Sequence, residues 1–384
     1  MKIGIDARAL QTSHRFRGIG SYAANLIENI ASLDLTNEYV FFSQGNNEGL
    51  HNIKFPEKFR YEEKFTKNVQ DPSRYNWYFD QFFLPKAINH SKVKVIHFLD
   101  QLSAPIVKAA KTVITVNDLM QFHGQESSWK NKVKIQSITS ADKIIAISEY
   151  TKKDIIKHFQ ISKDRIKVIY DGYDEKYFRP ADDQLILKEI RKKILGKEDE
   201  HYLFYSGSFE HHEPRKNVDF LLDILEELDK RNFKKINIVL SGKEGEESKR
   251  LKAEAAKLSL TNRLIFVGFL TKEELVHCYQ AALAFVFPSL GEGFGLPPLE
   301  AMACGCPVVS SNISSLPEVV GEAGIMISPN DPKLWATAIE KISNNHNYRQ
   351  TLINSGFKQA KKFSWKKCAQ ETIETYKEVA NDKN

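Results

Sequence analysis

The sequence predicts an α/β protein made of two doubly wound domains, each with a parallel sheet between layers of helices. Short β-branched or aromatic runs alternate with amphipathic helical patterns along the 384 residues, which is typical of repeated βαβ units. The alternation breaks once near the middle, and the chain is about two to three times the length of a typical domain. We therefore expect ligands at the carboxyl ends of the strands, in a deep cleft where the two domains face each other.

The first domain is predicted to cover residues 1–180, with a helix from about Ser21 to Leu33 whose apolar residues recur every three or four positions. Its strands are expected at Ile3–Asp6, Tyr39–Phe42, Val93–Phe98, Thr112–Val116, Lys143–Ser148 and Ile166–Tyr170. From Asp171 the pattern weakens, Pro180 ends any regular element, and a charged stretch follows, so we interpret residues 181–200 as a linker.

The second domain is predicted to cover residues 201–363, and the Lys-rich helix of residues 364–384 is expected to return to the first domain. Thr271 and Glu274 form a capping box at the start of one helix. Strands are expected at Tyr202–Ser206, Ile236–Leu240, Leu264–Val267, Leu283–Phe287 and Pro307–Ser310, and helices at Asn217–Leu228, Ser248–Leu258 and from about Leu296.

Composition limits the possible partners. There are 55 Lys and Arg against 49 Asp and Glu, a net charge of +6, which fits a small anionic ligand or weak contact with an acidic membrane surface and does not require nucleic acid. The four cysteines lack metal-ligand spacing and are interpreted as buried thiols. The amino terminus reads as a strand rather than a signal peptide, and no apolar run is long enough to span a membrane. We expect a cytoplasmic protein, with peripheral contact at the inner face of the membrane as an option.

The segment from Leu283 to Gly305 carries the most chemical information. An apolar strand ends at Pro288, a loop with Gly291, Gly293 and Gly295 follows, and a helix is expected to begin near Pro297. Glycines let the backbone approach a ligand, and free N–H groups with the helix dipole favour an anion such as a diphosphate. Glu292 and Glu300 flank Gly-Phe-Gly; each alone could be a surface charge or a partner of the helix dipole.

A second constellation follows the strand at Tyr202–Ser206. Gly207 ends that strand, and Arg215 and Lys216 are expected where the next helix starts. Cations at the amino end of a helix oppose its dipole, so this pair indicates an anion at that point, although an exposed pair of basic residues is the simpler alternative.

The nine residues from Glu292 to Glu300 match the Glu-x7-Glu motif of the retaining glycosyltransferase family 4, and the chain resembles that family, also known as group 1 and including mannosyltransferases. The motif is preceded by Phe-Pro-Ser and followed by Glu-Ala-Met-Ala-Cys-Gly-Cys-Pro-Val-Val. The resemblance implies the GT-B fold. It also implies that Glu292 contacts the donor sugar, that Gly293, Phe294, Gly295 and Leu296 hold sugar and phosphate, and that Glu300 binds the ribose.

The same resemblance implies that Gly207, Arg215 and Lys216 clamp the donor diphosphate, and Glu292, Lys216 and Arg215 are the predicted catalytic residues. Ser208 stands where many members carry an arginine, so Arg215 is our candidate for supplying that charge. In the first domain, Gly18 and Gly20 resemble a glycine loop bordering the donor. Asn117 and Asp118 are the candidate acceptor-side residues, with Asn117 in place of the family's histidine.

The resemblance implies transfer of a hexose with retention and without a metal or other cofactor, and the sequence has no Asp-x-Asp. Expected partners are a nucleotide-sugar donor, with GDP-mannose as the first to test, and a glycan or lipid-linked acceptor of surface polysaccharide synthesis. The aromatic segment Arg74–Pro85 is either a core helix, an acceptor wall or a membrane contact. The alternatives are a bilobal sugar- or nucleotide-binding protein without catalysis, an epimerase or phosphorylase of the same fold, and a dehydrogenase. The last is disfavoured because Ala23 stands where the third dinucleotide-binding glycine belongs.

Overall fold

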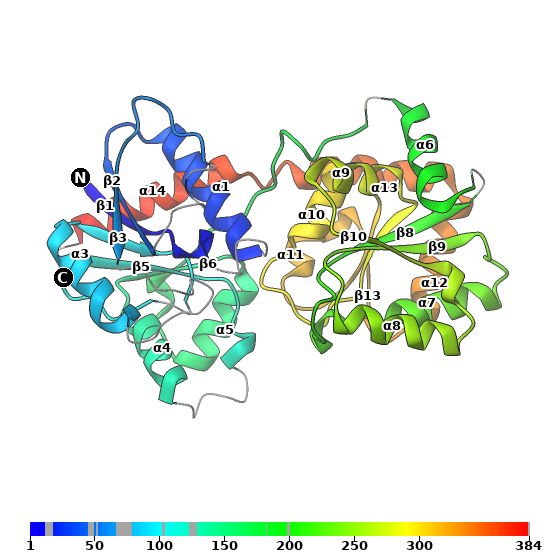
Figure 1. The fold of residues 1–384 in the computed structure, drawn as a ribbon, viewed down its shortest axis with the longest axis horizontal. Coiled ribbons are helices and arrows are strands. Elements are labelled where there is room, and N and C mark those ends of the chain that lie inside the picture. Colours follow the sequence, from blue (N-terminus) through cyan, green and yellow to red (C-terminus); the bar gives the residue numbers. More distant parts are fainter. Residues whose placement is uncertain are drawn as a thin grey trace. The chain divides into compact units, whose positions relative to one another are not determined.

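The computed structural model describes residues 1–11, 18–44, 50, 53–66, 79–101, 104–122, 129–181, 183–197 and 200–382. These residues divide into two compact units, one made of residues 1–172 and 363–384 and the other of residues 173–362. Each unit is a parallel sheet with helices on both faces (Figure 1). The prediction of two doubly wound α/β domains is therefore confirmed.

The first unit contains a seven-stranded parallel sheet in the order β3-β2-β1-β4-β5-β6-β7. Its strands are β1 (Lys2–Asp6), β2 (Glu38–Gln44), β3 (Arg60–Thr66), β4 (Val95–Phe98), β5 (Lys111–Val116), β6 (Lys143–Ala146) and β7 (Ile166–Val168). Its helices are α1 (Gly18–Leu33), α3 (Leu84–Ser91), α4 (Trp129–Ser140), α5 (Glu149–Phe159) and α14 (Trp365–Asn381). The central strands are nearly continuous apolar runs, as expected where helices cover both faces of the sheet. All six strands expected in this half are present, and β3 is an addition.

The second unit contains a six-stranded parallel sheet in the order β10-β9-β8-β11-β12-β13. Its strands are β8 (His201–Ser206), β9 (Ile236–Ser241), β10 (Leu264–Gly268), β11 (Ala284–Phe287), β12 (Val308–Ser311) and β13 (Ile325–Ile327). Its helices are α6 (Gln184–Leu195), α7 (Phe220–Lys230), α8 (Glu246–Lys257), α9 (Lys272–Ala281), α10 (Leu296–Ala303), α11 (Leu316–Val320), α12 (Pro332–Asn344) and α13 (His346–Ala360). The capping box predicted at Thr271 and Glu274 opens α9.

The interpretation of residues 181–200 as a linker was wrong in two respects. The division between the units falls after Gly172, not within 181–200. The charged stretch also contains α6, which is capped by Asp183 at its amino end and by Gly196, with a φ of 74°, at its carboxyl end. A helix with one strongly buried apolar side chain, Leu187, looks like a solvated linker in the sequence because most of its residues face solvent.

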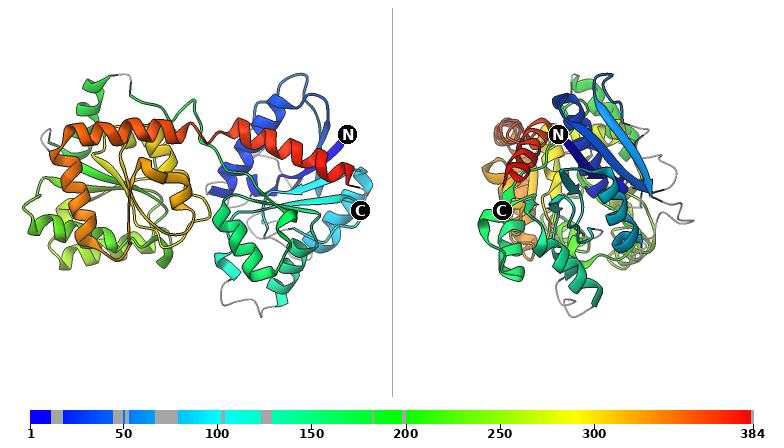
Figure 2. Two further views of the ribbon diagram at one scale, coloured as in Figure 1. Left: turned by 180° about the vertical axis from the view of Figure 1, so that it is seen from behind. Right: turned by 90° about the vertical axis from the view of Figure 1, so that its left-hand side faces the viewer.

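The carboxyl-terminal helix α14 belongs to the first unit, where it packs along α1 (Figure 2). Ser364 caps its amino end by accepting a hydrogen bond from the amide of Lys367. The start of α14 is closely packed against the end of the first segment of this unit, because a Cβ added at Gly172 would lie 2.1 Å from the backbone nitrogen of Trp365.

Three further features bear on the sequence analysis. All four cysteines are buried free thiols, as expected. Within the described ranges, no helix is both long and apolar enough to cross a membrane. The aromatic segment Arg74–Pro85 is described from residue 79 onward, as a π-helical turn (Phe79–Phe83) that leads into α3, and its earlier residues lie outside the described ranges.

Candidate functional site

The order of strands in the second sheet points to one crevice. From β8 the chain passes to β9 and β10 on one side, and then crosses back to place β11 on the other side of β8. Loops that leave two such neighbouring strands diverge to opposite faces of the sheet, and ligands of doubly wound sheets bind between them at the carboxyl ends. The loops after β8 and β11 are the two that the sequence analysis singled out.

Hydrogen bonds join these two loops. The amide of Leu290 donates to the carbonyl oxygen of Arg215 at 2.7 Å, and the hydroxyl of Ser289 lies 3.1 Å from the same oxygen. Asn217, which has a left-handed φ of 53°, donates from its side-chain amide to the carbonyl of Pro288 at 3.1 Å. Main-chain groups therefore fix the basic loop against the glycine-rich loop.

The basic residues do not stand at the start of a helix as predicted. They occupy a single 3₁₀ turn, Pro214–Lys216, and α7 begins later, at Phe220. The turn ends at the left-handed Asn217, which redirects the chain into α7. The dipole argument for an anion at this helix consequently does not apply to Arg215 and Lys216, and the argument for an anion has to come from their own contacts.

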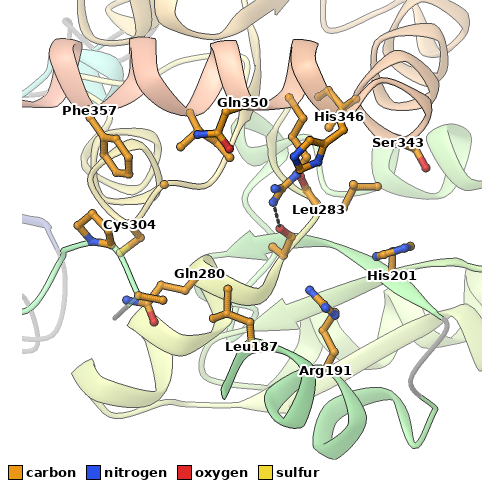
Figure 3. Close-up of a pocket in the computed structure, with 17 residues that line it drawn as sticks. Leu187, Arg191, His201, Gln280, Leu283, Cys304, Ser343, His346, Gln350 and Phe357 are labelled. Carbon is orange, nitrogen blue, oxygen red and sulfur yellow. Dashed lines mark hydrogen bonds between the residues drawn. The ribbon is translucent and has the colours of Figure 1, made fainter. Parts of the chain in front are cut away.

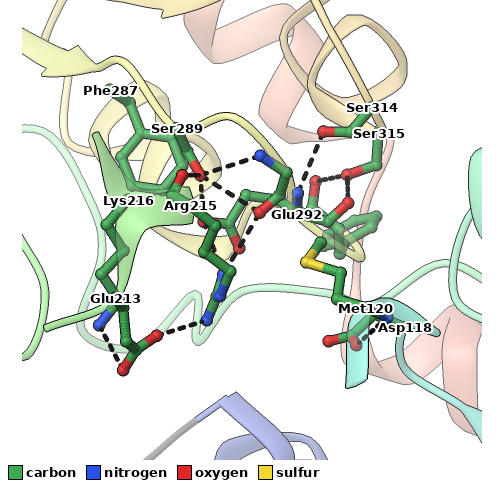
Figure 4. A network of polar contacts seen from close by, with 12 residues as sticks. Asp118, Met120, Glu213, Arg215, Lys216, Phe287, Ser289, Glu292, Ser314 and Ser315 are labelled. Atoms are coloured by element: carbon green, nitrogen blue, oxygen red, sulfur yellow. Dashed lines mark hydrogen bonds and ion pairs between the residues drawn. The ribbon is translucent and has the colours of Figure 1, made fainter. Parts of the chain in front are cut away.

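Glu213 holds both cations (Figure 4). One carboxylate oxygen lies 3.0 Å from Nη2 of Arg215, and the other lies 3.2 Å from Nζ of Lys216. Lys216 also donates to the carbonyl of Ser208 at 3.2 Å. Burial lowers the pKa of Lys216, while the charge of Glu213 acts in the opposite direction. Taking a lysine out of water is costly unless negative charge compensates it, and Glu213 supplies that charge in this structure.

Glu292 is fixed by hydroxyl groups and by Arg215. Its Oε1 accepts a hydrogen bond from Ser289 at 2.8 Å and lies 3.4 Å from Nη1 of Arg215. Its amide donates to the hydroxyl of Ser314 at 3.1 Å, and its carbonyl accepts from Ser315 at 2.9 Å. The position of this carboxylate is therefore determined from both its side chain and its main chain.

The glycine-rich loop leads into α10 through Gly295, which has a φ of 124°. An added Cβ there would approach the side chain of Leu316 to 2.9 Å, so both backbone conformation and space favour glycine. Phe294 is buried, and its carbonyl accepts from Ser315 at 2.6 Å. No side chain caps the amino end of α10, whose first residue is Leu296. The positive end of this helix dipole is thus available to an anion.

Glu300 lies in the second turn of α10. The hydroxyl of Tyr279 donates to its carboxylate at 3.2 Å. Burial raises the pKa of Glu300 to about 8, and the hydrogen bond from Tyr279 acts against this shift. A carboxyl group of this kind changes charge near neutral pH and can accept hydrogen bonds from hydroxyl groups of a ligand.

Gly207 directly follows β8, as expected, and lies against the loop after β9. Its amide donates to the carbonyl of Ser241 at 2.9 Å, and a Cβ added at Gly242 would meet the Gly207 carbonyl oxygen at 1.8 Å. The turn after β8 is therefore closely packed. The second unit thus brings together the residues that the sequence assigned to the diphosphate clamp and to the Glu-x7-Glu loop.

The other four predicted site residues belong to the first unit. Gly18 and Gly20 lie in the first turn of α1, so the expected glycine loop is the start of a helix at these positions. Asn117 and Asp118 follow β5. Asn117 is buried, and its side-chain amide donates to the carbonyl of Leu99 at 3.4 Å. It thereby connects the segments after β4 and β5.

Sequence reasoning gave no role to Glu213, Ser289, Ser314 or Ser315. Glu213 stood directly before Pro214 in the basic loop, and its proximity to two cations was the available signal. Ser314 and Ser315 act over 21 to 23 residues when they bond the glycine-rich loop, which no local pattern reveals. Ser289 lies only three residues before Glu292, to which it donates a hydrogen bond. Within the described ranges, no group of three or more His, Cys, Asp or Glu residues is placed to hold a metal ion.

Comparison with known proteins shows the family of this chain. Residues 187–359 match the family described as glycosyl transferases group 1, and residues 16–177 match glycosyltransferase family 4. O-antigen chain mannosyltransferase B of Escherichia coli is 34% identical over 275 residues, which cover 70% of each chain. The serotype-specific mannosyltransferase WbdA of the same species is 33% identical over 63% of this chain, but the match spans only 29% of WbdA.

The fold is similar to that of solved structures. HepE from Anabaena, crystallised in complex with UDP-glucose, has a TM-score of 0.76 at 18% identity, with 98% of this chain and 99% of that chain covered.

Proposed function

This chain belongs to the group 1, or family 4, glycosyltransferases, which have the GT-B fold, and we propose that it moves a hexose from a nucleoside diphosphate sugar to a glycan or lipid-linked acceptor. The observation that carries the proposal is the pair of Arg215 and Lys216, fastened to the loop that leads to the uncapped amino end of α10. Two cations and a helix dipole at one switch point are suited to a diphosphate.

The proposed chemistry follows from the charges at the bond that breaks. When the glycosyl–phosphate bond opens, negative charge grows on the leaving nucleoside diphosphate. Arg215, Lys216 and the amino end of α10 are positioned to stabilise that charge, and losing one such group costs roughly 2.7–4 kcal/mol of barrier. A donor diphosphate would compete with Glu213 for both cations. The charge of the leaving group thus replaces that of a protein carboxylate.

Glu292 is assigned to the donor sugar and Glu300 to the ribose. Glu292 is fixed by Ser289 and Arg215, so it can hold a sugar hydroxyl in one orientation. We propose retention of anomeric configuration without a metal ion, with the donor phosphate accepting the proton of the acceptor hydroxyl. Asn117 and Asp118, at the carboxyl end of β5, are proposed to lie on the acceptor side.

GDP-mannose is the proposed donor, and surface polysaccharide synthesis is the proposed setting, because the relatives named above are an O-antigen chain mannosyltransferase and a serotype-specific mannosyltransferase. The test is incubation of the purified protein with GDP-mannose, UDP-glucose and other nucleotide sugars, each with and without mannosylated acceptor oligosaccharides. Acceptor-dependent release of nucleoside diphosphate supports transfer. NMR of the new linkage tests retention, and unchanged rates in EDTA test independence from metal ions.

The same assay separates transfer from two of the alternatives. A binding protein without catalysis would raise the melting temperature in the presence of donor but would release no nucleoside diphosphate. An epimerase of this fold would change the donor sugar in the absence of any acceptor. Either result would contradict the proposed transfer.

Peripheral contact with the inner face of a membrane is also proposed, and exposed aromatic residues of the first unit support it. Phe82 and Phe83 are 56% and 51% exposed, which is unusual for side chains of this size, and the chain carries a net charge of +6. Co-sedimentation with phosphatidylglycerol vesicles is the test. Replacing both with serine should reduce the bound fraction, whereas equal binding of the variant would contradict the contact.

A further inference from the structure

A cavity of about 660 Å³ lies in the second unit, at the opposite edge of the sheet from the proposed donor site. Its wall includes His201, at the start of β8, and Leu283, which directly precedes β11. The proposed donor site is built from the loops that leave the carboxyl ends of these same two strands. Since the two ends of a parallel strand lie on opposite edges of a sheet, the cavity is separate from that site.

The cavity is lined by basic side chains. Arg191 of α6 and Arg349 of α13 both face it, together with His201 and His346. Within the described part of the chain, the residues that line the cavity include no Asp or Glu. Figure 3 shows Arg191 and His346 reaching toward the cavity from different helices. His346 is also the first residue of α13, whose dipole adds positive potential at this end.

The two arginines have carbonyl groups as partners, not carboxylates. Arg349 donates to the carbonyls of Ala282 at 3.1 Å and Leu283 at 3.4 Å, and Arg191 lies 3.5 Å from the carbonyl of Ala281. Nε of Arg191 is buried without a hydrogen-bond partner. Among the residues that the structure describes, no carboxylate forms an ion pair with either guanidinium. Burial and the neighbouring charge of Arg191 lower the pKa of Arg349.

Two partly buried cations that repel each other are unfavourable without a compensating anion. The hydrogen bonds to carbonyl groups at the end of α9 use some of the N–H donors of the two arginines, but these carbonyl groups supply no compensating negative charge. Guanidinium groups match phosphate oxygens in geometry and charge, and the volume is in the range of small-molecule pockets. We infer that this cavity binds the phosphate group of a small molecule, between Arg191, Arg349 and His346.

The test is isothermal titration of the full-length protein with inorganic phosphate and, separately, with mannose 1-phosphate. Both titrations use the Lys216→Ala background, so that anion binding at the proposed donor site does not dominate the signal. His346→Glu places a carboxylate at the cavity without removing either arginine, and a glutamate in the first turn of α13 favours the helix. Lys193→Gln removes a charge from exposed α6 surface outside the cavity and is the matched control.

We expect binding in the background protein, about tenfold or more weaker binding with His346→Glu, and unchanged binding with Lys193→Gln. Arg191→Gln combined with Arg349→Gln should abolish binding if the double variant folds. Tighter binding of the sugar phosphate identifies an organic phosphate as the ligand, and equal binding identifies free phosphate. No heat of binding at millimolar concentration, or equal affinity of the His346→Glu protein, would overturn the inference and leave the arginines as caps of α9. Neither result would bear on sugar transfer.

Discussion

The Nη1 atom of Arg215 lies 3.4 Å from Oε1 of Glu292. Together with the 2.7 Å hydrogen bond between the amide of Leu290 and the Arg215 carbonyl, this contact makes the loops after β8 and β11 one connected structure. The group proposed to neutralise the leaving diphosphate is therefore fixed relative to the group proposed to hold the sugar. This coupling sets the expectations for substitutions on either side.

Replacing Lys216 with alanine should lower kcat/KM by about tenfold or more, because the leaving diphosphate loses one charged donor. The side chain bonds mainly to Glu213 and to the Ser208 carbonyl, so the melting temperature should change little. Steady-state rates and thermal melts check this. Lys243→Ala is the matched control, since that lysine pairs with Glu210 on the surface. Wild-type activity of the Lys216 variant would contradict the proposed clamp.

Replacing Glu292 with alanine should also reduce transfer by about tenfold or more, while the affinity for the free nucleoside diphosphate stays within about threefold. The reason is that Glu292 is assigned to the sugar and not to the phosphates. Its amide and carbonyl bonds to Ser314 and Ser315 remain in the variant. Kinetics combined with calorimetric titration of GDP and UDP measures both quantities. Equal loss of transfer and diphosphate affinity would place Glu292 on the phosphate instead.

Replacing Glu300 with glutamine should stabilise the protein at pH 8 and weaken nucleotide binding. Burial raises the pKa of Glu300 to about 8 in the folded protein, from an ordinary value of 4.5. The unfolded chain therefore loses this proton first, and the wild type loses stability as pH rises from about 4.5 until the folded pKa is reached. Glutamine has no such penalty.

Melting curves of both proteins between pH 5 and pH 9 provide the check. The variant and the wild type should melt alike near pH 5 and diverge as the pH rises. A constant difference across the whole range would show that Glu300 is ionised in the folded protein throughout. Weaker binding of GDP or UDP by the variant at pH 8 tests the assignment to the ribose.

The strands buried on both faces could be predicted from sequence, because a run such as Leu283–Phe287 has few alternatives to a central parallel strand. The strand β3 was missed for the opposite reason. It lies at the edge of its sheet and pairs only with β2. Charged residues such as Glu62 and Lys64 are tolerated there and protect an exposed edge, so the segment lacks an apolar pattern.

In the candidate site, the residues that could be predicted are those whose role depends on their own backbone conformation or on their immediate neighbours in the sequence. Gly295 is needed for a backbone conformation that other residues rarely adopt, and Glu292 stands in the same short loop. Glu213 and Ser315 escaped notice because their importance comes from tertiary contacts. The position of Arg215 and Lys216 on a 3₁₀ turn was also unpredictable, since the left-handed Asn217 that ends the turn depends on carbonyls of residues 288 and 329.

A buried histidine links the carboxyl-terminal helix to the first sheet. His97 of β4 is fully buried, with Nδ1 2.7 Å from the hydroxyl of Tyr376 and Nε2 2.8 Å from the hydroxyl of Thr115. Thr115 in turn lies 2.9 Å from the hydroxyl of Tyr22 in α1. This network connects α14, two central strands and α1, so the neutral state of the imidazole bears on the stability of the first unit.

Stability should accordingly fall below pH 6.5 by an amount that depends on His97. Burial lowers its pKa from 6.5 to about 3. Below pH 6.5 the unfolded chain binds a proton that the folded chain excludes. The free energy of unfolding therefore falls by about 1.4 kcal/mol for each unit of decreasing pH, until the folded pKa is reached. Urea unfolding followed at pH 7 and pH 5 should show a loss about 2 kcal/mol larger in the wild type than in His97→Gln, which cannot take up the proton. Because both proteins share every other titrating group, equal losses would mean that the imidazole is protonated within the folded network.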